Sequence, residues 1–103
     1  VDVLEAEGIT ALSAKDGRDG IYEMRSRGDI SAVILDLDMA MMDGEGFRKE
    51  QLADPSLAGV PVIVVSGRMD YAEQATALGA SAALRKPFRS AQLLEALRSL
   101  QKA

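Results

Sequence analysis

Residues 32–44 of the chain, AVILDLDMAMMDG, join a short apolar run to two carboxylates and an Asp-Gly pair. An apolar run without polar alternation is typical of a strand that is buried on both faces of a parallel sheet. The strand is expected to end where the apolar run ends, which places Asp36 at its carboxyl end. Open α/β sheets bind ligands at that edge, so Asp36 is a candidate nucleophile or metal ligand. Asp43-Gly44 is expected to form a turn that closes the segment.

Length, composition and charge restrict the class of protein. With 103 residues and a mass of 11.0 kDa, residues 1–103 are expected to form a single domain. The net charge of −4 argues against direct nucleic-acid binding, which needs clustered Lys and Arg. There is no apolar run long enough to span a bilayer and no signal peptide, so we expect a cytoplasmic protein without membrane contact.

Two residue types are missing from the sequence, and their absence excludes several chemistries. The chain has no cysteine and no histidine. Disulfides, thiolate sites and cysteine nucleophiles are therefore excluded, as are histidine bases, histidine metal ligands and phosphohistidine. Any chemistry must use carboxylates, hydroxyls, lysines and the backbone.

Apolar runs alternate with segments of helical periodicity, which predicts βα units, a parallel sheet and helices on both of its faces. Glycines are expected to end several of the helices, and Asp16-Gly17 is expected to form a turn. Asp70 with Glu73 resembles a capping box at the start of one helix, and Ser90 can cap the last helix. The predicted elements are the tail of a helix at 1–7 before Gly8, a strand at 9–14, a helix at 18–27 with Ile21 and Met24 on one face, a strand at 32–35, a weaker helix at 44–53 around Phe47 and Leu52, a strand at 60–65, a helix at 71–78, a strand at 81–84, and a helix at 90–101 whose Leu93, Leu94, Leu97 and Leu100 face the core.

Three polar residues follow three successive predicted strands. Asp36, Ser66 and Lys86 each lie just past a strand, and parallel strands place their carboxyl ends side by side. Each residue alone is unremarkable, because a serine there is usually a turn residue and a lysine a solvated charge. Together they are expected to converge on one site.

These residue types permit phosphoryl chemistry. A carboxylate can attack phosphorus and form an acyl phosphate. The resulting anion needs a cation, a hydroxyl donor and usually Mg²⁺, and Lys86 and Ser66 supply the first two. Asp36 can also bind the metal, with the backbone carbonyl near Asp38 as a further ligand.

Several short motifs resemble the receiver domain of two-component response regulators over the whole chain. They are Asp36-Leu37-Asp38-Met39 with Asp43-Gly44, then Val64-Val65-Ser66-Gly67, Leu78-Gly79-Ala80 and Lys86-Pro87-Phe88. The resemblance implies a flavodoxin-like, doubly wound parallel sheet with strand order 2-1-3-4-5. It also implies a signalling domain in a phosphorelay and not an enzyme.

The resemblance assigns roles to individual residues. Asp36 would be the phosphoacceptor, taking a phosphoryl group from a histidine kinase or a histidine phosphotransfer protein. Ser66 would be the switch hydroxyl and Lys86 the phosphate-pairing lysine. The Lys86–Pro87 bond is cis in that family, and Pro87 and Gly44 would be structural.

The sequence departs from the family pattern at three points. Ala40 replaces a loop proline, and Ala83 replaces the aromatic switch residue, which an alanine cannot imitate. The family's first, central strand and the acidic pair at its end are not found, so we expect an N-terminally incomplete domain. The gap would be closed by dimerisation or strand exchange, or by the neighbouring strands themselves. Mg²⁺ binding should then be weak, because Asp2 lies in the predicted helix tail and is no substitute.

Two other functions remain open at this stage. Residues 32–38 also fit the first motif of haloacid-dehalogenase-type phosphatases, although Met39-Ala40 replaces the usual Gly-Thr and no later acidic pair follows. A receiver-like module that binds partners without phosphorylation is the other alternative, favoured by Ala83. The expected partner face is formed by residues 71–78, 81–84 and 90–101.

Overall fold

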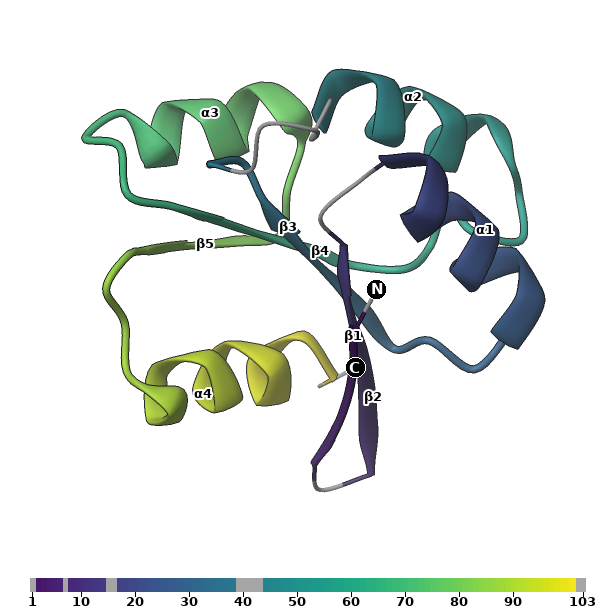
Figure 1. Ribbon diagram of the computed structural model, residues 1–103, viewed down its shortest axis with the longest axis horizontal. Coiled ribbons are helices and arrows are strands. Elements are labelled where there is room, and N and C mark those ends of the chain that lie inside the picture. The colour runs from purple at the N-terminus through teal and green to yellow at the C-terminus, as the bar shows by residue number, and fades with distance from the viewer. Residues whose placement is uncertain (1, 7, 15–16, 39–43, 102–103) are drawn as a thin grey trace.

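The computed structural model describes residues 2–6, 8–14, 17–38 and 44–101, and it contains strands and helices in alternation after an initial hairpin (Figure 1). The Asp16-Gly17 and Asp43-Gly44 turns, and Ala40, fall wholly or partly outside these residues. The elements are β1 (Asp2–Ala6), β2 (Ile9–Ala14), α1 (Gly17–Arg27), β3 (Ala32–Asp36), α2 (Gly44–Ala53), β4 (Val62–Ser66), α3 (Tyr71–Leu78), β5 (Ala82–Arg85) and α4 (Ser90–Gln101).

The five strands form one sheet in the order β1-β2-β3-β4-β5. The pairs β2–β3, β3–β4 and β4–β5 are parallel, whereas β1 runs antiparallel to β2 at the edge. The structure therefore confirms the α/β class with a parallel sheet. Figure 1 shows α4 on one side of the sheet and the other three helices on the opposite side, so both faces carry helices.

The prediction of a helix tail at residues 1–7 was wrong, because residues 2–6 form β1. Ala6 faces Ile9 across a two-residue connection, and Gly8 has a φ of 79°. A glycine with positive φ ends a helix as readily as it turns a hairpin, so Gly8 alone does not distinguish the two. Asp2 pairs with Ser13 and lies two strands from β3, roughly 10 Å to the side.

The pairing between β2 and β3 is direct. Its register runs from Ala11 opposite Ala32 to Ala14 opposite Leu35. In the expected order 2-1-3-4-5, a further strand would separate these two, and none does so among the described residues. The backbone groups of β2 and β3 bond to one another instead.

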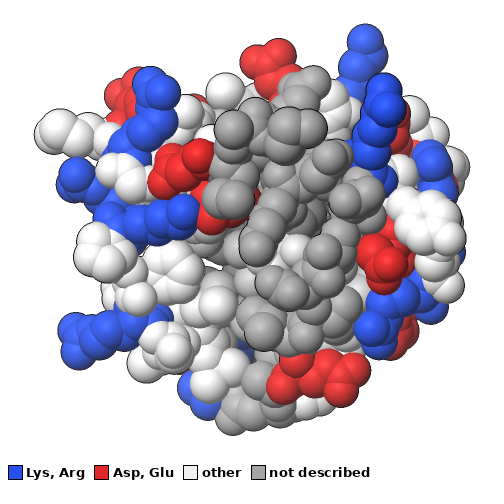
Figure 2. Space-filling model, viewed as in Figure 1, with Lys and Arg blue, Asp and Glu red and all other residues white. Residues whose placement is uncertain are grey.

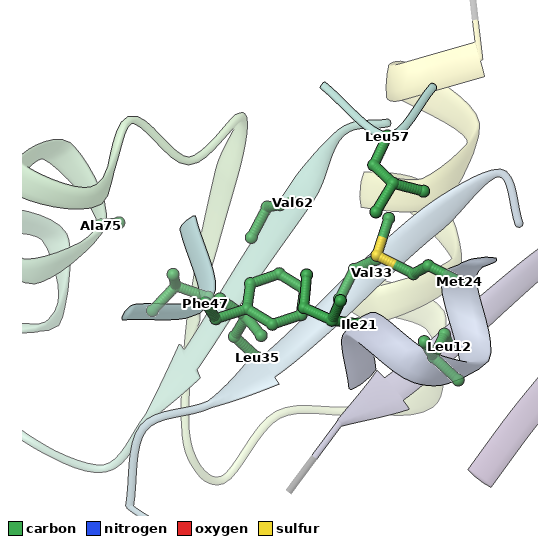
Figure 3. Packing of buried hydrophobic residues seen from close by; sticks show 10 residues of the cluster. Leu12, Ile21, Met24, Val33, Leu35, Phe47, Leu57, Val62 and Ala75 are labelled. Carbon is green, nitrogen blue, oxygen red and sulfur yellow. The ribbon is translucent and has the colours of Figure 1, made fainter. Parts of the chain in front are cut away.

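Buried apolar side chains form a separate core on each face of the sheet. The larger core lies under α1, α2 and α3, where Figure 3 shows the side chains gathered over β2, β3 and β4; its buried members are Leu12, Ile21, Met24, Val33, Leu35, Phe47, Leu57, Val62, Val64 and Ala75. The second core lies under α4 and contains Ile9, Ala11, Ala32, Ile34, Ile63, Val65 and Leu97, with Leu93 and Leu100 packed against it. Alternate residues of β3 and β4 therefore enter opposite cores.

Helix ends agree only in part with the predicted caps. Gly79 ends α3 in the left-handed conformation with a φ of 68°, as expected. Asp70 precedes α3 but makes no side-chain cap hydrogen bond, since its Oδ1 accepts from Arg68 Nε at 3.0 Å. Ser90 was predicted to cap α4 but is its first helical residue. The residue before it, Arg89, donates its N–H to Gln92 Oε1 at 2.8 Å.

Gly44 begins α2 where two side chains approach closely. A Cβ at this position would lie 3.1 Å from Leu37 Cδ2 and 3.1 Å from Leu78 Cδ1. A larger residue would press on both, so glycine allows the start of α2 to pack against the end of α3.

The buried face of α2 differs from the predicted one. Phe47 is buried as expected, but Leu52 is 53% exposed and Gln51 is fully buried. Residues four apart share a helix face, whereas residues five apart do not, so Gln51 lies beside Phe47. An apolar pattern misses this position, because the buried residue is polar.

The buried side chain of Gln51 bonds to three other residues. Its Nε2 donates to the carbonyls of Leu57 at 3.0 Å and Val60 at 2.9 Å. Its Oε1 accepts from Arg48 Nη1 at 2.6 Å, and Arg48 Nε donates to the Leu78 carbonyl at 2.8 Å. These bonds tie α2 to the loop after it and to the end of α3.

We expect Gln51→Ala to lower the free energy of unfolding by about 2–3 kcal/mol, because the Leu57 and Val60 carbonyls each lose a donor, and among the described residues only that of Leu57 keeps another, the Val60 N–H. Urea denaturation followed by circular dichroism would measure the change. Leu52→Ala, on the exposed face of the same helix, is the control and should change stability by less than about 0.5 kcal/mol. A larger loss for Leu52→Ala than for Gln51→Ala would contradict this assignment.

Candidate functional site

The predicted polar residues meet at the carboxyl edge of the sheet. Asp36 ends β3, Ser66 ends β4, and Lys86 follows β5 directly. The registers place Asp36 opposite Val65 and Ser66 opposite Arg85, so the three positions lie on neighbouring strands. The structure brings all three together.

Lys86 forms an ion pair with Asp36. Its Nζ lies 2.7 Å from Asp36 Oδ2, between side chains that are 35% and 20% exposed. The hydrogen bond to Asp36 raises the pKa of Lys86 above its usual value, so the lysine is charged at neutral pH. The other carboxylate oxygen of Asp36 accepts the Asp38 N–H at 3.0 Å. The peptide bond between Lys86 and Pro87 is cis, as the resemblance implied.

The side chain of Asp38 belongs to the site, although sequence analysis used only its backbone. Its Oδ1 accepts the Ser66 hydroxyl at 3.0 Å, and its Oδ2 accepts the Gly67 N–H at 2.6 Å. Lys86 Nζ lies 3.5 Å from the same Oδ2. The Gly67 bond, followed by those of Ser66 and Lys86, lowers the pKa of Asp38 below its usual value. The sequence signal for this contribution was the position of Asp38, two residues after Asp36.

Ser66 is fully buried at the end of β4. While donating to Asp38, its Oγ accepts the Arg68 N–H at 3.1 Å. Arg68 Nε in turn donates to Asp70, so the loop between β4 and α3 is held from both ends. A Cβ on Gly67 would lie 3.2 Å from Asp38 Oδ2, so the glycine allows the carboxylate its close approach.

Ala83 lies in β5, the strand that Lys86 follows. It faces Val64 in the neighbouring strand β4, and its partly buried side chain packs against the larger core. A methyl group has no rotamers to exchange, so this side chain cannot act as a rotamer switch.

Charged side chains of both signs lie on the face that Figure 2 shows. Figure 2 shows Lys and Arg side chains interspersed with Asp and Glu over the described part of one face. A nucleic-acid surface would instead require clustered cations. Separately, none of the helices within the described ranges is long and apolar enough to cross a membrane.

Comparison with known proteins identifies the family. Residues 1–98 match the model of the response regulator receiver domain. The chain therefore belongs to the response regulator receiver domain family. Domains of this family act in two-component signalling and are generally not classed as enzymes, which disfavours the phosphatase alternative.

Solved structures with the same fold are receiver proteins. Chemotaxis response regulator CheY4 of Vibrio cholerae is 25% identical, with a TM-score of 0.69 over 82% of this chain and 72% of that one. A response regulator receiver domain protein from Clostridium thermocellum is also 25% identical, with a TM-score of 0.69 over 86% and 71%. CheY6 from R. sphaeroides, solved in complex with the P1 domain of CheA3, is 22% identical, with a TM-score of 0.65 over 85% and 72%.

Receiver domains generally bind Mg²⁺ at an acidic site, and the described residues fit such a site poorly. Within them, no group of three or more acidic, histidine or cysteine side chains is placed to hold a metal. Asp36 and Asp38 both contact Lys86 as well. Mg²⁺ favours near-octahedral oxygen coordination, which two carboxylates shared with a lysine do not supply.

We expect Ser66→Ala to lower the free energy of unfolding by about 1 kcal/mol, because Asp38 loses a donor and the Arg68 N–H loses its acceptor. Urea denaturation would measure this loss. Ser99→Ala, at an exposed position of α4, is the matched control and should have little effect. Equal stability of the Ser66 variant and the parent protein would contradict the hydrogen bonding described here.

Proposed function

We propose that this chain is a phosphoacceptor domain, in which Asp36 receives a phosphoryl group from a phosphohistidine donor in a phosphorelay. The observation that carries the proposal is the Asp36–Lys86 pair at the carboxyl edge of the sheet, with the Ser66 hydroxyl bonded to Asp38, which Lys86 also contacts. A nucleophilic carboxylate, a fixed cation and a hydroxyl donor are what acyl phosphate formation needs.

The transfer would be a single displacement at phosphorus. One Asp36 oxygen forms a bond to phosphorus, while the bond between phosphorus and the donor imidazole nitrogen breaks. The electron pair of the broken bond stays on the imidazole, which leaves as the neutral base or takes a proton from water. Lys86 offsets the charge on the phosphoryl oxygens, and Ser66 donates a hydrogen bond to one of them.

The expected donor is a histidine kinase or a histidine phosphotransfer protein. Residues 1–103 contain no histidine, so the phosphohistidine donor must lie outside them. The complex of CheY6 with the P1 domain of CheA3 supports a protein partner of this kind.

A module that binds partners without phosphorylation is the second candidate. Ala83 favours it, because this residue cannot relay a change at Ser66 by switching rotamer. The intact set of Asp36, Ser66 and Lys86 favours the phosphoacceptor, since binding alone does not require a nucleophile paired with a cation.

Phosphorylation of Asp36 can be tested with a small donor. We expect acetyl phosphate with Mg²⁺ to add one phosphoryl group to the protein, measured by intact mass, and Asp36→Asn to abolish the adduct. Asp70→Asn is the matched control, because Asp70 lies on a nearby loop and pairs with Arg68. It should retain the adduct.

An adduct that persists in Asp36→Asn would place the acceptor elsewhere and contradict the proposal. Absence of an adduct from the parent protein, under conditions that modify an established receiver domain, would favour the phosphorylation-independent module.

Mg²⁺ is expected to bind weakly to this chain, because Asp36 and Asp38 already share one lysine and other described acids do not join them. Isothermal titration calorimetry should therefore show a dissociation constant in the millimolar range or no measurable heat. A dissociation constant in the low micromolar range would contradict this expectation and indicate further ligands.

A further inference from the structure

Three hydrogen-bond donors at the carboxyl edge of the sheet surround the carboxylate of Asp38. They are the Ser66 hydroxyl at 3.0 Å, the Gly67 N–H at 2.6 Å and the Lys86 ammonium at 3.5 Å. We call these three donors the anion cradle. They come from β4, the residue after it and the residue after β5, so the sheet fixes their relative positions.

The anion cradle is also next to Asp36. Lys86 bonds to Asp36 Oδ2 at 2.7 Å, and the Asp38 N–H bonds to Asp36 Oδ1 at 3.0 Å. A phosphoryl group on Asp36 would carry its anionic oxygens beside Lys86, at the edge where Ser66 and Gly67 end and follow the neighbouring strand β4. It therefore needs the donors that Asp38 already occupies.

Charge adds to this conflict. Before phosphorylation, two carboxylates share one ammonium group. Acyl phosphate formation replaces the charge of Asp36 with a group whose charge lies between −1 and −2 at neutral pH, by analogy with other phosphorylated side chains. The Asp38 carboxylate then stands beside a stronger anion, and a partly buried site screens their repulsion incompletely.

We infer that the Asp38 carboxylate is an internal occupant of the anion cradle and competes with the phosphoryl group of Asp36 for Ser66, Gly67 and Lys86. This inference rests on the proposed function, to which it adds a residue that limits phosphorylation. Phosphorylation requires the Asp38 side chain to leave the cradle, and loss of the phosphoryl group lets it return.

Occupancy can be measured without any phosphoryl transfer, using inorganic phosphate as the probe. In the Asp36→Asn background no acyl phosphate can form, and binding to the cradle is followed by the ¹⁵N NMR shift of the Gly67 amide. We expect Asp38→Ala in this background to lower the dissociation constant of phosphate by about tenfold or more, because it frees charge-assisted donors.

Two further substitutions separate occupancy from charge. Asp38→Asn removes the charge but keeps an amide oxygen that can still accept from Ser66 or Gly67. Its effect should therefore be smaller than that of Asp38→Ala. Asp70→Asn removes one negative charge from the adjoining loop without touching the cradle, and it should leave phosphate binding nearly unchanged.

Several results would overturn the inference. Equal phosphate affinity of Asp38→Ala and the Asp38 parent would mean that the carboxylate does not obstruct the cradle. Equal gains from Asp38→Ala and Asp38→Asn, or a similar gain from Asp70→Asn, would mean that charge alone acts. A Gly67 amide that does not shift with phosphate in any variant would mean that no anion cradle exists.

The reaction itself provides the second measurement. With Asp36 intact, Asp38→Ala should increase the initial rate of labelling by acetyl phosphate by about tenfold, and Asp38→Asn by a smaller factor. If phosphate binds as expected but no protein with intact Asp36 is labelled, the proposed function fails while the occupancy stands. If the parent protein, Asp38→Ala and Asp38→Asn are labelled at the same rate, the inferred competition is contradicted and the proposed function stands.

Discussion

The site depends on one ammonium group that lies between two carboxylates. Lys86 Nζ contacts Asp36 at 2.7 Å and Asp38 at 3.5 Å, in a region where the side chains are only partly exposed. Without this cation, two like charges would lie near each other in a partly buried site, which is costly. The lysine therefore helps to stabilise two acids at the end of one strand, together with the Ser66 and Gly67 donors of Asp38.

The position of this lysine is a product of strand pairing. β3, β4 and β5 are parallel neighbours, so the residue that ends each strand emerges at the same edge. Alternate apolar residues of β3 and β4 anchor the sheet in two cores, which prevents these strands from slipping in register. A slip of one residue would turn Asp36 to the opposite face and separate it from Lys86. The buried apolar residues of β3 and β4 thus fix the relative positions of Asp36, Ser66 and Lys86 at the carboxyl edge of the sheet.

The predictable parts of this molecule are those in which sequence pattern and tertiary structure agree. Continuous apolar runs identified the central strands, and glycine stops and leucine spacing identified the last two helices. The initial hairpin was missed because Gly8 suits both a helix end and a tight turn. Gln51 was missed because its burial depends on two loop carbonyls, Leu57 and Val60, which no local pattern reveals. The side chain of Asp38 was missed because its partners follow a different strand.

Ala83 and Asp38 together bear on how the edge of the sheet would respond to the proposed phosphorylation. In this chain, Ser66 has no aromatic neighbour at residue 83 to direct, so a change at its hydroxyl must pass through its own hydrogen bonds. Those bonds lead to Asp38 on one side and to the Arg68 N–H on the other. Arg68 is paired with Asp70 at the start of α3. Displacement of Asp38 would alter the acceptor of Ser66 first, and the loop of residues 67–70 is the next element in contact. If Asp36 is phosphorylated as proposed, the hydrogen bonds of Ser66 provide a route to this loop that does not require a rotating core side chain.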